Sequence, residues 1–144
     1  MGGIASRSAG VAARRKRLVS LSLTLPEAEA EVAGATHLAF KVRKRIFAYY
    51  CNNHHGDGVI ALWCKAPAGE QARFVSQDSE RYFVPPYVGP RGWVGLRLDT
   101  PRLEWAEVKD LLFGSYYLRA PDALRRDVGR AAKRGSPARR RTTR

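Results

Sequence analysis

The chain has 144 residues, of which 44% are hydrophobic and 10% aromatic, and its formal net charge at pH 7 is +13. This length and apolar content predict one globular domain and exclude an intrinsically disordered chain. No run approaches the roughly 20 apolar residues of a transmembrane helix, and no secretory signal is recognisable. We therefore expect a cytoplasmic protein that has no membrane partner.

The positive charge is concentrated at the two ends of the chain. Residues 1–17 contain five basic residues and residues 133–144 contain six, and neither segment contains an acid. Residues 18–132 are nearly neutral, with 15 basic residues against 13 acidic ones. We expect a flexible basic arm over 1–17, one domain over 18–132 and a flexible basic tail over 133–144. Such segments either bind phosphate backbones without reading sequence or are simply solvated.

The first predicted element is a helix over residues 18–25, where leucines recur at helical spacing. It should end before Pro26, which then begins a short acidic turn that runs to Gly34. Three segments of strand composition follow, at 38–42, 45–51 and 58–65. They predict an antiparallel meander, with an exposed basic first turn at 43–45 and a glycine-containing second turn at 52–58.

The second half of the chain adds three helices and one strand to this meander. We predict a helix within residues 67–82, a strand at 93–99, a helix at 105–120 and a last helix at about 121–132. This order predicts an α+β fold. We expect a two-layer sandwich in which an antiparallel sheet, the meander plus the later strand, is packed by helices.

Both faces of the meander are apolar in the predicted strands. Alternation places Ile46, Ala48 and Tyr50 on one face, and Phe47 and Tyr49 on the other. One face must pack against helices. The second face is either an aromatic platform for nucleic-acid bases or a surface that the terminal helices cover, and we expect the helices to cover it.

Residues typical of metal and catalytic sites occur, but not in the required patterns. The candidate ligands are His37, Cys51, His54, His55, Asp57 and Cys64. Zinc sites need two closely spaced ligand pairs, and only one such pair is present. A hairpin at 52–58 would also leave the two cysteines too far apart for a disulfide. We therefore expect solvated histidines, reduced cysteines and neither metal nor cofactor; no nucleophile motif is present, so no enzyme is predicted.

The segment FVPPYVGPRGWVG, at 83–95, contains three prolines and three glycines. Pro85 and Pro86 fix two φ angles, whereas the glycines permit turns and close backbone approach. A loop of this kind is either a stiff corner between strands or a preorganised binding surface. Arg91 should point outwards, and Trp93 should be packed at the start of a strand.

The middle of the chain resembles the MmcQ/YjbR family of small bacterial proteins. The matching segments are LP at 25–26, LAFKVRKRIFAYY at 38–50, IALWCKAPAGEQ at 60–71, RYFVPPYVGPRGWVGLRLD at 81–99 and WAEVKDLLFGSYYLRAP at 105–121. The resemblance covers about residues 18–125 and implies a CyaY-like fold. It also implies a proposed double-wing DNA-binding role, with no enzymatic activity and no cofactor. Members usually have Gly-Lys at the first hairpin turn, where this chain has Lys44-Arg45.

These observations lead to two hypotheses for the function. The first is DNA binding with little sequence preference, in which the tails add affinity and the phosphate contacts come from five residues: Lys41, Arg43, Lys44, Arg45 and Arg91. The near neutrality of residues 18–132 argues against it. The second is a module that binds a small molecule or a protein, as a monomer, in an aromatic groove formed by Phe47, Tyr49, Trp63, Tyr87 and Trp93.

Overall fold

The computed structural model describes residues 3–34 and 36–126, and the side chains from Gly10 onward. The predicted tail at 133–144 and the second half of the predicted last helix lie outside the described residues. Among the described residues, no helix combines the length and the apolar character needed to cross a membrane.

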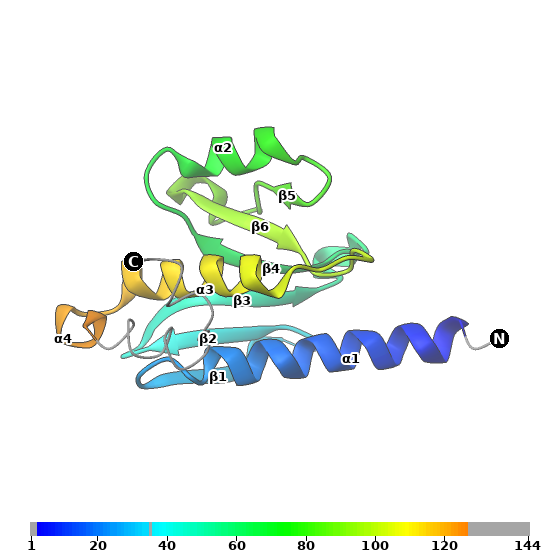
Figure 1. Cartoon of the computed structure of the whole chain (residues 1–144), viewed down its shortest axis with the longest axis horizontal. Coiled ribbons are helices and arrows are strands. Elements are labelled where there is room, and N and C mark those ends of the chain that lie inside the picture. Colours follow the sequence, from blue (N-terminus) through cyan, green and yellow to red (C-terminus); the bar gives the residue numbers. More distant parts are fainter. Residues whose placement is uncertain (1–2, 35, 127–144) are drawn as a thin grey trace.

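The centre of the fold is a six-stranded sheet with the order β1-β2-β3-β4-β6-β5 (Figure 1). Each strand is antiparallel to its neighbours. The strands are β1 (Ala28–Val32), β2 (Leu38–Val42), β3 (Arg45–Asn52), β4 (Ile60–Lys65), β5 (Tyr82–Phe83) and β6 (Trp93–Arg97). The predicted meander is β2-β3-β4, and the predicted later strand is β6.

Four helices accompany this sheet: α1 (Gly3–Ser22), α2 (Glu70–Gln77), α3 (Trp105–Arg119) and α4 (Asp122–Arg125). The main core lies between one face of the sheet and the helices, and it includes Leu18 of α1, Leu62 of β4 and Leu112 of α3. Figure 1 shows α1 and α3 running along the sheet. The predicted α+β fold is confirmed.

The sequence predicted a flexible arm for the N-terminal segment, and the structure differs from that prediction. From Gly3 onward it is helical, as part of α1. The Arg14 guanidinium donates to the carbonyl oxygens of Leu98 and Thr100, at 2.5 and 2.7 Å. The prediction failed because the segment has no apolar periodicity, although alanine, arginine and lysine are strong helix formers. The described domain therefore begins well before residue 18.

Residues 28–32 form an edge strand, not the predicted acidic turn. Their sequence, AEAEV, alternates small and acidic residues, but alanine and glutamate have low strand propensity. Pairing with β2 decides the conformation, because Ala28 is opposite Val42 and Val32 is opposite Leu38. The short β5 was also not predicted.

A β-bulge changes which side chains of β3 share a face. Lys41 of β2 is opposite Ile46, whereas the preceding Phe40 is opposite Ala48, so Phe47 is the extra residue. Phe47 is fully buried in the main core, where its ring packs edge-on against Tyr116 at 5.3 Å between centroids. The predicted faces of Ile46 and Phe47 are therefore wrong, because a bulge interrupts strict alternation.

The second face of the sheet is covered by a loop, and not by the terminal helices as expected. A smaller core lies there, made of Cys51, Ala61, Trp63, Val88 and Trp93. Val88 belongs to the proline-rich loop. The loop is fastened to α2 because the Gln71 side-chain amide donates to the carbonyl oxygens of Gly89 and Trp93, at 2.8 and 2.6 Å.

Candidate nucleic-acid interface

The register of the sheet brings the two predicted phosphate-binding segments to the same end of the molecule. β3 begins at Arg45, next to the turn at 43–44, and runs antiparallel to β4, which ends at Lys65. Lys65 is opposite Trp93, the first residue of β6. The loop that carries Arg91 therefore lies at the same end as the β2–β3 turn. Three neighbouring strand ends span roughly 10 Å, about three base-pair steps of duplex DNA.

The first turn consists of Arg43 and Lys44, and Arg45 already belongs to β3. Both turn residues have positive φ, 49° and 70°, which two-residue type I′ hairpin turns require. Glycine or asparagine usually occupies such positions because a β-carbon is unfavourable there. The turn keeps this backbone without a glycine, and all three basic residues at 43–45 are exposed, as predicted.

Two of the five predicted phosphate-binding cations are paired with acids. The Arg43 guanidinium binds both carboxylate oxygens of Glu27, at 2.5 and 2.9 Å. The Lys41 ammonium lies 2.8 Å from a carboxylate oxygen of Glu31 in β1. The sequence did not predict these pairs because it did not predict that the acidic segment forms a strand beside β2.

Arg45 and Arg119 fasten the end of α3 to the start of β3. Arg45 donates to the carbonyl oxygen of Arg119, and Arg119 donates to that of Ile46, each at 3.0 Å. Both guanidinium groups therefore bind uncharged carbonyls and keep their full charge. Arg119 was not predicted as a site residue, since only the packing of α3 brings it to this end.

Arg91 is exposed, as predicted, and its carbonyl oxygen accepts a hydrogen bond of 2.6 Å from the Lys65 ammonium. In the part of the chain that the structure describes, the charged groups of Lys44 and Arg91 have no hydrogen bond or ion pair. We call Lys44, Arg45, Lys65, Arg91 and Arg119 the basic end of the sheet.

Three of the five residues of the predicted aromatic groove, Tyr49, Trp63 and Trp93, lie together in the structure. The ring of Tyr49 lies 6.0 Å from that of Trp63 and 5.8 Å from that of Trp93, measured between centroids. Phe47 is absent from this group, because the bulge directs it into the main core. Trp93 is buried against the smaller core, as expected for the start of a strand. The remaining groove residue, Tyr87, is 71% exposed.

The histidines of the second turn lie beside these aromatic residues. His54 packs against Trp63, with 5.0 Å between ring centroids, and also lies next to His37, His55 and Tyr87. Burial lowers the pKa of His54, and the neighbouring histidines lower it further. Within the described residues, no group of three His, Cys, Asp or Glu side chains could hold a metal ion.

The two cysteines form no disulfide with each other and lie in different cores, Cys51 in the smaller one and Cys64 in the main one. Burial raises the pKa of Cys51 to about 12 and also raises that of Cys64. A raised pKa keeps both thiols protonated at neutral pH, so neither is activated as a nucleophile.

A cavity of about 880 Å³ between α2 and α3 is a feature that the sequence did not predict. Glu107 is one of four acids that line it, and both of its carboxylate oxygens bind the Arg81 guanidinium, at 2.5 and 3.1 Å. The Tyr82 hydroxyl donates to the same carboxylate. Burial raises the pKa of Tyr82, and the hydrogen bond to Glu107 raises it further. The ion pair between Arg81 and Glu107 therefore joins α3 to the start of β5.

Comparison with known proteins identifies the family but no curated relative. The chain is similar to the crystal structure of Deinococcus radiodurans protein DR2400, family-model domain DUF419, with a TM-score of 0.62 and 19% sequence identity. The similarity covers 78% of this chain and 85% of that one. No curated protein matches the chain. The family model YjbR matches residues 23–118, and the chain therefore belongs to the YjbR family.

Proposed function

We propose that the protein binds duplex DNA, with little sequence preference and without catalysing a reaction, through the basic end of its sheet. The observation that carries the proposal is the register that places the β2–β3 turn and the Arg91 loop at one end. Phosphate contacts from lysine and arginine supply affinity without reading bases.

Several of these cations are held in position before any ligand binds. The hydrogen bonds of Arg45, Lys65 and Arg119 to backbone carbonyls restrict their side chains. A restricted side chain loses less conformational entropy when it binds a phosphate. α4 also lies at the end of the sheet where the β2–β3 turn is found (Figure 1). The chain continues from α4 into a segment with six basic residues, at 133–144, which would add affinity.

The test is fluorescence anisotropy of a labelled DNA duplex with the full-length protein at two salt concentrations. The double variant Lys44→Ala/Arg91→Ala should bind roughly three- to tenfold more weakly, and the slope of log affinity against log salt should fall by up to about 1.8. The control is Lys16→Ala/Arg73→Ala, which removes two exposed cations from α1 and α2. Equal losses of DNA affinity in both double variants would show that DNA is attracted by positive charge in general. That result would overturn the proposal that the basic end of the sheet is the interface.

A second candidate is supported by the exposure of Tyr87, which carries a positive φ of 66°. Its hydroxyl lies 3.4 Å from Nε2 of His55, and its ring lies beside the rings of His54 and His55. A strained, exposed aromatic residue is typical of a site that binds a small molecule or a protein. If this candidate is right, Tyr87→Ala abolishes binding of the small molecule or protein ligand. Tyr117→Ala, at another exposed tyrosine, leaves that binding unchanged.

A further inference from the structure

A cavity of about 490 Å³ lies beside the basic end of the sheet, between the start of α2 and the proline-rich loop. Three segments form most of its lining: residues 65–69 at the end of β4 and after it, residues 71–72 of α2, and residues 89–92 of the loop. Its volume is within the range of pockets that bind small ligands. The cavity is therefore large enough to hold a phosphate ester.

Two of the lining residues, Lys65 and Arg91, are cations, and none of the described residues that line the cavity is acidic. The Lys65 ammonium donates to the carbonyl oxygen of Arg91 at 2.6 Å, and this uncharged acceptor does not neutralise it. In the part of the chain that the structure describes, neither cation forms an ion pair. The neighbouring acid Glu70 lies outside the lining, and its carboxylate binds Arg73. The cavity is therefore positively charged.

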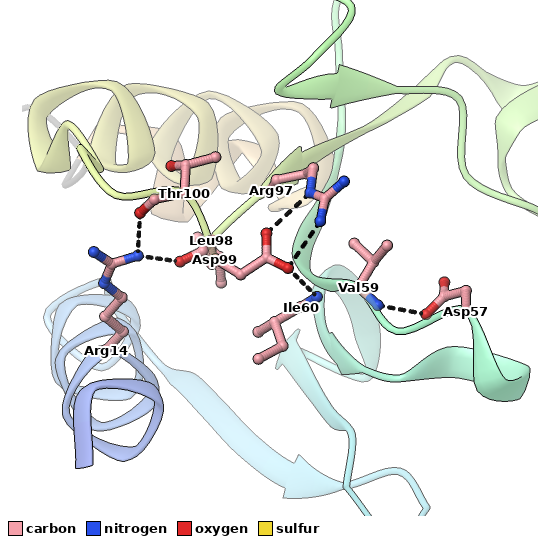
Figure 2. A network of polar contacts seen from close by, with 8 residues as sticks. All are labelled: Arg14, Asp57, Val59, Ile60, Arg97, Leu98, Asp99 and Thr100. Carbon is pink, nitrogen blue, oxygen red and sulfur yellow. Dashed lines mark hydrogen bonds and ion pairs between the residues drawn. The ribbon is translucent and has the colours of Figure 1, made fainter. Parts of the chain in front are cut away.

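The opposite end of β6 shows how this protein neutralises an arginine with an acid of its own. Arg97, the last residue of β6, donates to both carboxylate oxygens of Asp99, at 2.9 and 3.0 Å (Figure 2). The charge of Arg97 is thus balanced within the domain. Arg91 has no such carboxylate beside it, and an anionic ligand would take that place.

The start of α2 adds backbone donors to the same cavity. No side chain caps this helix, which follows Gly69, a residue with a φ of 82°. The N–H groups of the first turn of a helix have no partner within the helix. Gln71 and Ala72 belong to this first turn and line the cavity. Helix N-termini carry a partial positive charge and bind phosphate groups through such N–H groups.

The walls of the cavity are fixed before a ligand binds. The Gln71 side-chain amide donates to the carbonyl oxygens of Gly89 and Trp93, which fastens the loop to α2. The hydrogen bond from Lys65 to the Arg91 carbonyl oxygen fastens the loop to the end of β4. Binding therefore costs these segments little conformational entropy.

We propose that this cavity binds the terminal phosphate group of a DNA strand, so that the protein prefers phosphorylated strand ends. The proposal rests on the DNA binding proposed above and adds a specificity to it. A terminal phosphate is a monoester with a charge of about −1.5 to −2 at pH 7 and three acceptor oxygens. A phosphate inside a strand is a diester joined to a sugar on each side, so it cannot enter a cavity end-on. Lys65, Arg91 and the first turn of α2 supply donors to the oxygens of the monoester.

The test is fluorescence anisotropy of the full-length protein with three duplexes of one sequence, each labelled at an internal base. Their strands end in 5′-phosphates, in 3′-phosphates or only in hydroxyl groups. We expect at least one phosphorylated duplex to bind roughly three- to tenfold more tightly than the hydroxyl duplex. Equal binding of all three duplexes overturns this proposal and leaves the proposed function standing. The absence of binding to any duplex overturns both.

Two variants locate the preference in the cavity. Lys65→Gln removes one charge and keeps a donor for the Arg91 carbonyl oxygen, and Ala72→Leu narrows the cavity without a change in charge. Each should reduce the preference for phosphorylated ends to less than roughly twofold. The control is Lys44→Ala, outside the cavity, which should weaken binding of all three duplexes and keep the preference. A preference that persists in both cavity variants, or that Lys44→Ala removes equally, would overturn the proposal.

A free nucleotide carries the same phosphate monoester as a strand end. Isothermal titration calorimetry with thymidine 5′-monophosphate and with thymidine separates these two sources. The monophosphate should bind no more tightly than about 1 mM, because it lacks the rest of the DNA backbone, and thymidine should not bind. A dissociation constant of the monophosphate below about 0.01 mM, together with equal binding of the three duplexes, would assign the cavity to a free nucleotide and overturn the proposal.

Discussion

The Arg43 guanidinium and the Glu27 carboxylate form a two-bond ion pair across the start of β1 and the β2–β3 turn, at 2.5 and 2.9 Å. The hydrogen bond from Arg43 lowers the pKa of Glu27, so the pair remains charged at neutral pH. The pair also holds one cation of the turn away from any phosphate.

Replacing Glu27 by glutamine should strengthen DNA binding. The change releases the Arg43 guanidinium and adds one unit of positive charge beside the basic end of the sheet. We expect an increase of roughly threefold at low salt and a salt slope that is steeper by about 0.9. Glu80→Gln makes the same change in charge at an exposed residue elsewhere, and it should have a smaller effect in the same anisotropy assay.

Replacing Ser115 by alanine should destabilise the fold. The Ser115 hydroxyl of α3 donates to the Phe47 carbonyl oxygen at 2.5 Å and accepts from the Lys65 backbone nitrogen at 2.9 Å. Alanine would leave two buried backbone groups without partners, at a cost of about 2–4 kcal/mol. Urea unfolding measures the loss, and Ser76→Ala, at an exposed position of α2, should change stability by less than about 0.5 kcal/mol.

Gly95 is required because the Phe83 ring lies against the backbone of β6. A β-carbon at residue 95 would come closer than 3.0 Å to that ring. Gly95→Ala should therefore lower the free energy of unfolding by about 1–3 kcal/mol, and Phe83→Leu in the same chain should restore part of it. Gly114→Ala is the contrasting change, since its β-carbon would enter open space in α3 and should stabilise the helix by about 0.5–1 kcal/mol.

The packing of α1 against the domain can be measured at Arg17. Its guanidinium carbon lies 4.4 Å from the centroid of the Trp105 ring at the start of α3. Arg17→Ala should reduce stability by roughly 0.5–1 kcal/mol. The preceding residue, Lys16, is exposed on the same helix, so Lys16→Ala should have no measurable effect on urea unfolding. Equal effects of the two changes would contradict this contact.

The buried thiols should make the protein less stable in alkali. Burial raises the pKa of Cys51 to about 12, whereas an unfolded thiol ionises near pH 9. The stabilisation is therefore complete below pH 9 and is lost as the pH rises toward 12, by up to about 1.4 kcal/mol per pH unit. Unfolding of wild type and Cys51→Ala between pH 8 and 10.5 tests this: above pH 9 the variant should lose stability less steeply.

The sequence by itself determined the elements whose signal is local. Alternating β-branched and aromatic residues identified β2, β3, β4 and β6, and helical spacing identified α3, because these patterns depend on neighbours along the chain. The resemblance of five segments to one family, and the exposure of the basic turn, were likewise readable from the chain alone.

Tertiary structure alone decided the features that depend on distant partners. β1 is a strand because β2 pairs with it, and that pairing neutralises Lys41 and Arg43. The bulge moves Phe47 into the main core, and no spacing rule locates such an extra residue. Arg14 belongs to the domain because α1 packs beside the segment after β6, where the guanidinium binds backbone carbonyl oxygens. Pairings between strands and contacts between a helix and the sheet depend on the folded geometry, which local preferences do not contain.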